Sequence, residues 1–212
     1  MIRKRMLKYL GYGNGQEPSG EIKKLLEECL EEVKKEACPK AVVRKFHLDH
    51  DPLCLRETGD EIAGKQIGEL LDGCEECLLI GCTLGISIER TIRRMEKINM
   101  TKAVAMDAAA SAYLECFCDD YEGKLGIADR TFRACPGYGD FPLEFNQKIA
   151  KLLDIPKTLG AAVTASDLLI PQKTMLGIIG IGTTGQKRSC AACVRRKSCS
   201  FRKRGERCYE ID

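Results

Sequence analysis

The sequence predicts one domain that mixes α-helices with β-strands, followed by a small cysteine-rich module. Several stretches repeat apolar residues at helical spacing, which is typical of amphipathic helices. Shorter runs are dense in apolar and β-branched residues, which is typical of strands. The composition changes abruptly after Gln186, where basic residues and cysteines dominate. We therefore expect a main domain at residues 1–186 and a separate module at residues 187–212.

Composition and charge exclude several function classes. With 44% apolar and 31% charged residues the chain has the composition of a soluble protein, and a net charge of +3 is too small to indicate a nucleic-acid partner for the whole chain. The basic N-terminus has no apolar core, and the apolar runs are shorter than a membrane span, so we expect a cytoplasmic protein without a membrane partner. In the cytoplasm its thirteen cysteines stay reduced, as core residues, metal ligands or redox groups.

The elements of the main domain follow from periodicity and from helix start signals. Ser19 can cap the first clear helix, and a strand rich in valine and phenylalanine follows that helix. The predicted helices are Glu21–Ala37, Gly59–Leu71, Ser87–Ile98, Thr101–Asp119 and one from about Pro142 to Leu153, the predicted strands are Ala41–Leu48 and Cys77–Gly85, and Asp119–Ala128 is expected to be a loop or linker.

Two local motifs suggest metal or redox chemistry, but a structural interpretation is favoured for both. His47 and His50, the only histidines, flank Asp49, yet no regular element would aim these neighbouring side chains at one ion. Cys74 and Cys77 have the C-x-x-C spacing of redox pairs or metal ligands, yet Cys77 begins a strand-like run and Cys82 sits inside it, where small apolar residues belong. We expect a polar strand-to-turn segment at the histidines and buried strand thiols at the cysteines.

A further motif, G-x-G-x-x-G, is formed by Gly180, Gly182 and Gly185. Dinucleotide-binding folds place this motif between a strand and an apolar helix. The residues from Gln186 onward are instead basic and rich in cysteine. We therefore expect a strand that ends in a glycine hinge.

The C-terminal module carries four cysteines spaced C-x2-C-x5-C-x8-C in a short polar segment. A segment without its own hydrophobic core needs a metal to organise it, and four thiolates suit either zinc or an iron–sulfur cluster. The spacing leaves these two open, and the surrounding basic residues leave open a zinc knuckle that binds nucleic acid. The predicted metal ligands are Cys190, Cys193, Cys199 and Cys208.

The stretch from Arg133 to Gly177 carries the strongest signal for a ligand site. It opens with the turn Arg133-Ala-Cys-Pro-Gly137-Tyr138, which offers a planar guanidinium, a backbone freed by glycine for close approach, and a phenol. An amphipathic helix and an apolar segment up to a loop around Pro171 follow. The groups of the turn suit a small ligand that bears a carboxylate.

Several motifs, in their order and spacing, resemble those of one family. They are Thr83-Leu-Gly85, Asp107-Ala-Ala-Ala110, Arg133-x-x-x-Gly137-Tyr138, a helix from Pro142, and Val163-Thr164-x-Ser166 followed by Pro171 and Gly177. From Thr83 to about Gly177 the chain resembles the activation (reactivation) domain of cobalamin-dependent methionine synthase. More closely, it resembles the free-standing versions of that domain in anaerobic bacteria, whose start is also similar to LKYLGYGNGQEP in this chain.

The resemblance implies an α+β fold with a curved antiparallel sheet and flanking helices that binds S-adenosylmethionine. In this family the domain rescues an inactive cob(II) corrinoid: one electron gives cob(I), and a methyl group from S-adenosylmethionine gives methylcobalamin. By motif, Arg133 would hold the ligand carboxylate, and Ala134, Cys135 and Gly137 would offer backbone contacts. Tyr138 would sit near the corrin as the candidate catalytic residue. A partner, methionine synthase or another corrinoid protein, would carry the cobalamin, and a separate donor would supply the electron.

The chain departs from the family at the site itself. Ser111 stands where the long helix of the family carries an acidic residue that meets the ligand ammonium. Ligand binding would then be weaker, use other groups such as Asp107 or Asp140, or be lost. The family's later tyrosine pair has no counterpart, because the glycine hinge and the cysteines stand there. Two other functions stay open: a metal-binding adaptor that docks onto a corrinoid protein without S-adenosylmethionine, and the basic zinc knuckle. If the module holds an iron–sulfur cluster, the chain would carry the electron as well as the methyl donor.

Overall fold

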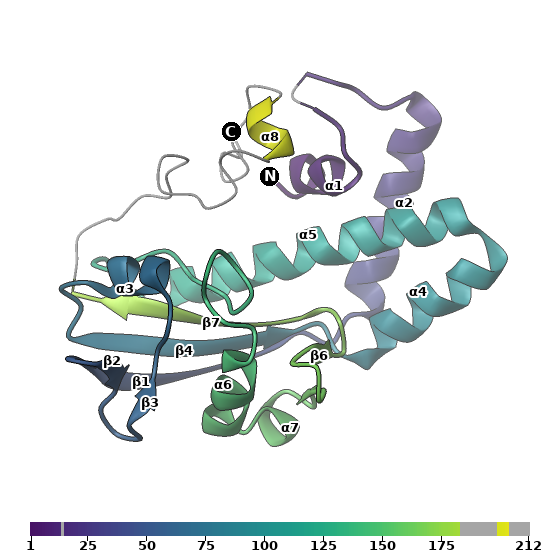
Figure 1. Cartoon of the computed structure of the whole chain (residues 1–212). Helices are drawn as coiled ribbons and strands as arrows, with labels where there is room; N and C mark the ends of the chain where they lie inside the picture. Colours follow the sequence, from purple (N-terminus) through teal and green to yellow (C-terminus); the bar gives the residue numbers. More distant parts are fainter. Residues whose placement is uncertain (14, 183–198, 204–212) are drawn as a thin grey trace.

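A five-stranded antiparallel sheet forms the centre of the computed structural model, which describes residues 1–13, 15–182 and 199–203 (Figure 1). Its strand order is β3-β2-β1-β4-β7, and a separate pair of short strands joins β5 to β6. The strands are β1 (Lys40–His50), β2 (Leu53–Leu55), β3 (Asp60–Glu61), β4 (Glu76–Thr83), β5 (Ala162–Val163), β6 (Leu169–Ile170) and β7 (Thr174–Ile181). The predicted α+β fold, with an antiparallel sheet and flanking helices, is confirmed.

Strand β4 lies between β1 and β7 and is the most buried part of the sheet. Gly81 in β4 faces Val42 of β1 on one side and Leu176 of β7 on the other. Every residue of β4 after Glu76 is buried. Because both of its faces are covered, the sequence of β4 is apolar throughout and does not alternate with polar residues.

Helix α5 runs along one face of the sheet beside β7, and three more helices pack against α5, so that four helices share the core on this side (Figure 1). They are α1 (Ile2–Tyr9), α2 (Gly20–Glu36), α4 (Ile86–Ile98) and α5 (Met100–Lys124). The inner side of α5 is rich in alanine, and its buried residues Ala105, Ala109 and Ala112 let neighbouring helices pack closely. Ser19 caps α2, as predicted, because its hydroxyl accepts a hydrogen bond from Ile22 N at 3.4 Å.

The opposite face is covered by α6 and α7, and α3 contributes to the same core (Figure 1). The bounds are α3 (Lys65–Leu71), α6 (Phe145–Leu153) and α7 (Ile155–Thr158), and a short α8 (Ser200–Lys203) lies in the last described range. In this core the rings of Phe141 and Phe145 contact each other with centroids 5.1 Å apart. Within the described ranges, no helix has both the length and the apolar character that crossing a membrane requires.

Strand β7 contributes to both cores because its side chains alternate. Met175 and Ile179 pack toward α5, whereas Leu176 and Ile178 pack toward α6. The odd-numbered residues of β7 therefore share the face that α5 covers. This register decides which side chains meet at the candidate site.

The predicted helix Gly59–Leu71 is wrong in its first half. The chain at Asp60–Glu61 instead pairs with β2 as the short strand β3, and α3 begins only at Lys65. Gly64 separates the two elements with a φ of 124°, outside helical geometry. The inward positions were nevertheless correct, because Ile67 and Leu71 are buried.

The predicted loop over Asp119–Ala128 is also wrong for most of its length. Helix α5 continues to Lys124, because Cys118 and Glu122 on its inner side are buried against the sheet and the turn that follows. At its other end, Val104 lies on the outer side of the helix and is 50% exposed.

The structural interpretation of the histidine and cysteine motifs is confirmed. His47 Nδ1 lies 2.7 Å from Glu57 Oε1, and His50 Nε2 lies 2.7 Å from the carbonyl oxygen of Cys74. The thiols of Cys74 and Cys77 are fully buried. Among the described residues, no three His, Cys, Asp or Glu side chains gather so that they could hold a metal ion.

The glycine motif starts at the end of the last strand, as expected. Strand β7 ends at Ile181, and Gly182 follows with a φ of 110°. Gly180 belongs to β7 itself, whereas Gly185 lies outside the described residues.

Candidate functional site

The chain before the Arg133 turn runs along the outer edge of β7. Thr131 N donates to the Gly180 carbonyl at 3.0 Å. Ala134 and Ile178 exchange two backbone hydrogen bonds, of 2.9 Å and 2.8 Å. The even-numbered residues of β7 therefore turn their backbone groups toward this edge, and Leu176 does the same by the two-residue repeat of a strand. The turn begins where its chain leaves this edge.

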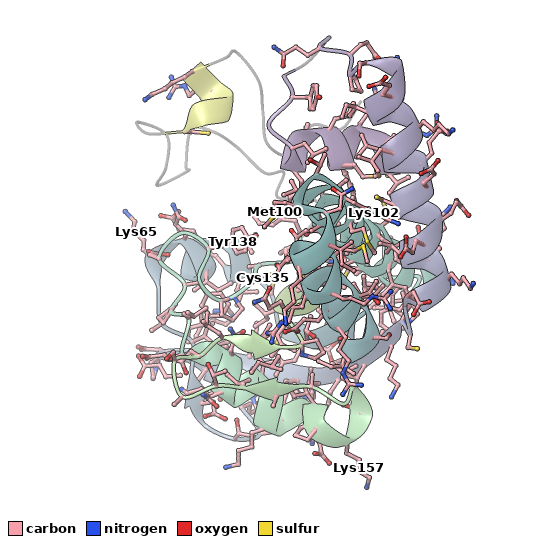
Figure 2. The ribbon with its side chains drawn as sticks, turned by 90° about the vertical axis from the view of Figure 1, so that its right-hand side faces the viewer. Lys65, Met100, Lys102, Cys135, Tyr138 and Lys157 are labelled. Carbon is pink, nitrogen blue, oxygen red and sulfur yellow. The ribbon has the colours of Figure 1, made fainter. Side chains whose placement is uncertain are left out.

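The turn itself is closed by short backbone hydrogen bonds. Tyr138 N donates to the Cys135 carbonyl at 3.1 Å, and Gly137 N donates to the Phe141 carbonyl at 2.8 Å. Gly137 has a φ of 86°, a conformation that only glycine adopts without strain. Figure 2 shows Cys135 and Tyr138 together, beside α5. Tyr138 is 75% exposed, so its phenol lies at the surface.

Asp140 ties the turn to the first residues of α3. Its carboxylate accepts hydrogen bonds from Lys65 N at 2.8 Å and from Gln66 N at 3.1 Å. Gly64 allows this approach, because a Cβ there would come within 2.9 Å of the Asp140 carbonyl oxygen. The Asp140 carboxylate is therefore engaged in holding the turn and is not presented to a ligand.

Arg133 points inward from the turn to the C-terminal half of α5. Its side chain is 8% exposed and forms ion pairs with Glu122 and, at 3.6 Å, with Asp119 Oδ1. Glu122 also binds Arg130 at 3.0 Å. The stem of Arg133 lies against Gly177, where a Cβ would come within 2.7 Å of Arg133 Cγ. The guanidinium that the sequence suggested for a ligand carboxylate is thus already held by two carboxylates of the protein.

Residues of helix α1 bind further carboxylates on α5. Arg5 binds Asp119 Oδ2 at 2.5 Å and lies 3.6 Å from Glu115 Oε2. The Tyr9 hydroxyl donates to Glu115 Oε1 at 2.7 Å. Burial and this hydrogen bond raise the pKa of Tyr9, and Tyr138 lies near enough to contribute to the shift. The N-terminal helix therefore borders the predicted site.

Three thiols lie close to Arg133. Cys82 of β4 and Cys118 of α5 are both buried and hydrogen-bonded to each other. The hydrogen bond from Cys118 lowers the pKa of Cys82, and the charge of Arg133 acts in the same direction. Cys135, on the turn, is half-buried and also close to Arg133. These thiols place polarizable sulfur atoms close to the Arg133 guanidinium.

A second part of the site lies at the start of β7. Lys173 Nζ binds Asp107 Oδ1 at 2.7 Å and Ser111 Oγ at 2.8 Å, and its side chain is only 11% exposed. A pocket of about 390 Å³ opens beside it. Sequence reasoning singled out Asp107 and Ser111 but missed Lys173. The sequence did contain a signal for Lys173, because it is the lone charged residue in the apolar segment Leu168–Gly182.

The predicted metal module lies almost entirely outside the described residues. Cys199 is half-buried and precedes α8. Cys190, Cys193 and Cys208 lie outside the residues that the structure describes. The four-cysteine site and the domain boundary at 187 therefore stay predictions.

The strand order and the helices on both faces define the fold class of a methionine synthase reactivation domain. The particular solved structure to which the chain is similar is described as "Crystal Structure of the MetH Reactivation Domain bound to AdoHcy". The TM-score is 0.65 at 13% sequence identity, and the match covers 97% of this chain and 83% of that chain. No family model matches the sequence, and no curated protein does. The likeness confirms the fold that the motifs suggested, whereas the likeness to free-standing versions stays a prediction.

Proposed function

We propose that this protein binds S-adenosylmethionine and supports the reductive methylation of cob(II)alamin on a separate corrinoid methyltransferase such as methionine synthase. The observation that carries the proposal is the shared fold over 97% of the chain with a domain solved with AdoHcy. AdoHcy is what S-adenosylmethionine becomes when it loses its methyl group. The motif turn lies on the edge of the same sheet that defines the fold.

The residues of the turn fit the positioning of such a ligand. Backbone hydrogen bonds of Ala134, Cys135 and Gly137 hold the turn beside the edge of β7, and their contacts to a ligand stay a prediction. Tyr138 is 75% exposed, and we propose that it faces a corrin held by a partner. The chemistry needs one electron from a donor and then transfer of the methyl group from sulfur to cobalt. It needs no acid or base, so orientation of the two reactants is the main contribution of the protein.

Arg133 already has two carboxylate partners inside the protein. Its guanidinium would reach a ligand carboxylate only by exchanging Glu122 or Asp119 for it. Its direct role in ligand binding therefore stays a prediction. We propose that in this chain Arg133 also positions the turn, through its two carboxylate partners.

Calorimetric titration of S-adenosylmethionine and AdoHcy into the wild-type protein tests the proposal. We expect both to bind, and we expect Tyr138→Ala to retain binding while slowing methylation of a corrinoid protein in the presence of a reductant. Lys157→Ala serves as control, because Lys157 lies on α7, well away from Tyr138 (Figure 2). Failure of the wild-type protein to bind either compound at ~1 mM would contradict the proposed function.

A separate candidate for the last segment rests on its four cysteines. We propose that residues 187–212 bind zinc or an iron–sulfur cluster through Cys190, Cys193, Cys199 and Cys208. A cluster would let the protein deliver the electron, whereas zinc would have a structural role.

A further inference from the structure

The pocket beside Lys173 is built from three separate elements. Glu89, Ile92, Arg93 and Glu96 come from α4, Asp107 comes from α5, and Gln172 and Lys173 come from the segment that leads into β7. At about 390 Å³ its volume is in the range of small-ligand sites. Charges of both signs line it, and the proposed function has not assigned them a role.

The wall that carries Lys173 is held rigidly. The Lys173 carbonyl accepts hydrogen bonds from Leu84 N at 2.9 Å and from Thr83 Oγ1 at 3.3 Å. Next to it, Gln172 N donates to Glu89 Oε2 at 2.9 Å, and the other oxygen of Glu89 binds Arg93. The Glu89 side chain is 8% exposed, and both of its carboxylate oxygens bind groups within the wall of the pocket. These bonds hold the backbone of Lys173 in place, and Asp107 and Ser111 hold its ammonium.

Lys173 and Asp107 both keep unused hydrogen-bonding capacity. An ammonium has three N–H donors, and Asp107 and Ser111 accept only two from Lys173 in the described part of the chain. Asp107 is half-exposed, and its Oδ2 atom has no partner among the described residues. Arg93, at the rim, offers donors beyond the one that binds Glu89, and its side chain is 66% exposed.

This charge pattern selects a zwitterion. The Lys173 ammonium opposes a metal cation, and the carboxylates of Glu96 and Asp107 oppose a phosphate dianion. A ligand with one carboxylate and one ammonium satisfies both signs at once. We infer that the pocket binds the α-amino-acid group of the ligand, with Lys173 and Arg93 on its carboxylate and Asp107 on its ammonium.

The inference deepens the proposed function and rests on it, because it names the groups that hold the methionine end of S-adenosylmethionine. Lys173 and the stem of Arg133 lie on the same face of β7, the face that α5 covers. Lys173 immediately precedes β7, and Gly177 follows it by four positions, which corresponds to about 13 Å of extended chain. In this inference the nucleoside of the ligand lies between the pocket and the turn that carries Tyr138. In this arrangement Arg133 keeps its internal partners.

Calorimetric titration of matched variants tests the inference. We expect Lys173→Met to weaken S-adenosylmethionine binding by about tenfold or more, since a charged hydrogen bond is lost. Decarboxylated S-adenosylmethionine, which lacks the carboxylate, should bind wild type and Lys173→Met equally. Asp107→Asn should weaken S-adenosylmethionine, and Lys157→Met, an exposed lysine on α7, should change nothing. Thermal unfolding of each variant checks that it is folded, and Lys173→Arg should restore part of the affinity.

The outcomes separate the inference from the proposed function. If S-adenosylmethionine binds wild type and Lys173→Met with equal affinity, the inference is overturned and the proposed function stands. If S-adenosylmethionine does not bind but L-methionine binds in a Lys173-dependent manner, the proposed function fails and the pocket stands. If neither compound binds the wild-type protein, both are overturned.

Discussion

The stem of Arg133 lies directly against the backbone of Gly177, so closely that a Cβ on Gly177 would stand 2.7 Å from Arg133 Cγ and 3.0 Å from the Ala134 carbonyl oxygen. Gly177→Ala must therefore displace the turn from β7. We expect it to destabilise the protein by about 1–3 kcal/mol and to weaken S-adenosylmethionine binding. Urea unfolding and calorimetry measure the two effects.

Gly123→Ala is the matched control for this change. Gly123 is an exposed glycine in α5, and a Cβ there meets nothing within 4 Å. Alanine should stabilise the helix by about 0.5–1 kcal/mol. If Gly177→Ala were as harmless as Gly123→Ala, the packing of Arg133 against β7 would be wrong.

The buried pair of Arg133 and Glu122 should show strong energetic coupling. Arg133→Met leaves the Glu122 carboxylate, 9% exposed, with only Arg130, and we expect a loss of about 3 kcal/mol. The double variant Arg133→Met/Glu122→Gln removes both charges of the pair. Its loss of stability should therefore be smaller than the sum of the losses in the two single variants, by about 1 kcal/mol or more. Denaturant unfolding of all four proteins gives the cycle.

An exposed ion pair provides the comparison for that cycle. Arg3 and Glu27 lie 2.9 Å apart with side chains 73% and 52% exposed. Glu27→Gln should change the stability by no more than about 0.5 kcal/mol. Equal effects at Glu27 and Glu122 would mean that burial does not determine the strength of the Arg133 pair.

The thiol of Cys77 should make the protein less stable in alkaline solution. Burial raises its pKa from 9.0 to about 12. Between these values the unfolded chain releases the thiol proton and the folded chain keeps it, so stability is full below pH 9 and falls as the pH rises toward 12. Cys77→Ala should reduce the loss of stability between pH 8 and pH 10 by about 1 kcal/mol, as measured by urea unfolding.

The cavity that Cys77→Ala creates lowers stability at both pH values and cancels in this difference. Cys38→Ala, which removes an exposed thiol, is the control. An unchanged difference in Cys77→Ala would show that another group causes the alkaline loss.

The four-cysteine module should determine the metal content of the protein. After anaerobic purification we expect about one zinc atom, or about two or four iron atoms, per chain, and we expect this metal to be lost in Cys190→Ser/Cys193→Ser. Brown protein that bleaches on reduction indicates the cluster, whereas colourless protein with zinc leaves only a structural role. Cys38→Ser/Cys54→Ser, at two thiols of the main domain, should keep the metal. Metal-free wild-type protein would contradict the module.

The elements with local signals could be predicted from the sequence, and those with distant causes could not. Helix α2 is specified by its Ser19 cap and by its own apolar stripe. Strand β3 has only two residues and exists because β2 pairs with it, so no periodicity reveals it. The last turns of α5 are helical because Glu122 is buried against Arg133, a partner that lies beyond the next loop.

The candidate site shows the same division. The turn at Gly137 is encoded locally, because a glycine is needed at its φ of 86°. The partners of Arg133 depend on how the chain crosses the edge of β7, which residue types alone do not specify. Lys173 was visible as a lone charge in an apolar segment, but only the packing of α5 against β7 shows that Asp107 and Ser111 receive it.

Strand β7 occupies an edge of the sheet and is the last strand in chain order within the described residues. During synthesis β1 and β4 can pair while β7 is still inside the ribosome. Helix α5 and the Arg133 turn are then already made, but Ala134 has no Ile178 to pair with, and Asp107 has no Lys173. The candidate ligand site can therefore form only late in synthesis. A chain that stops before Thr174 contains the whole motif turn and yet lacks the strand on which it rests.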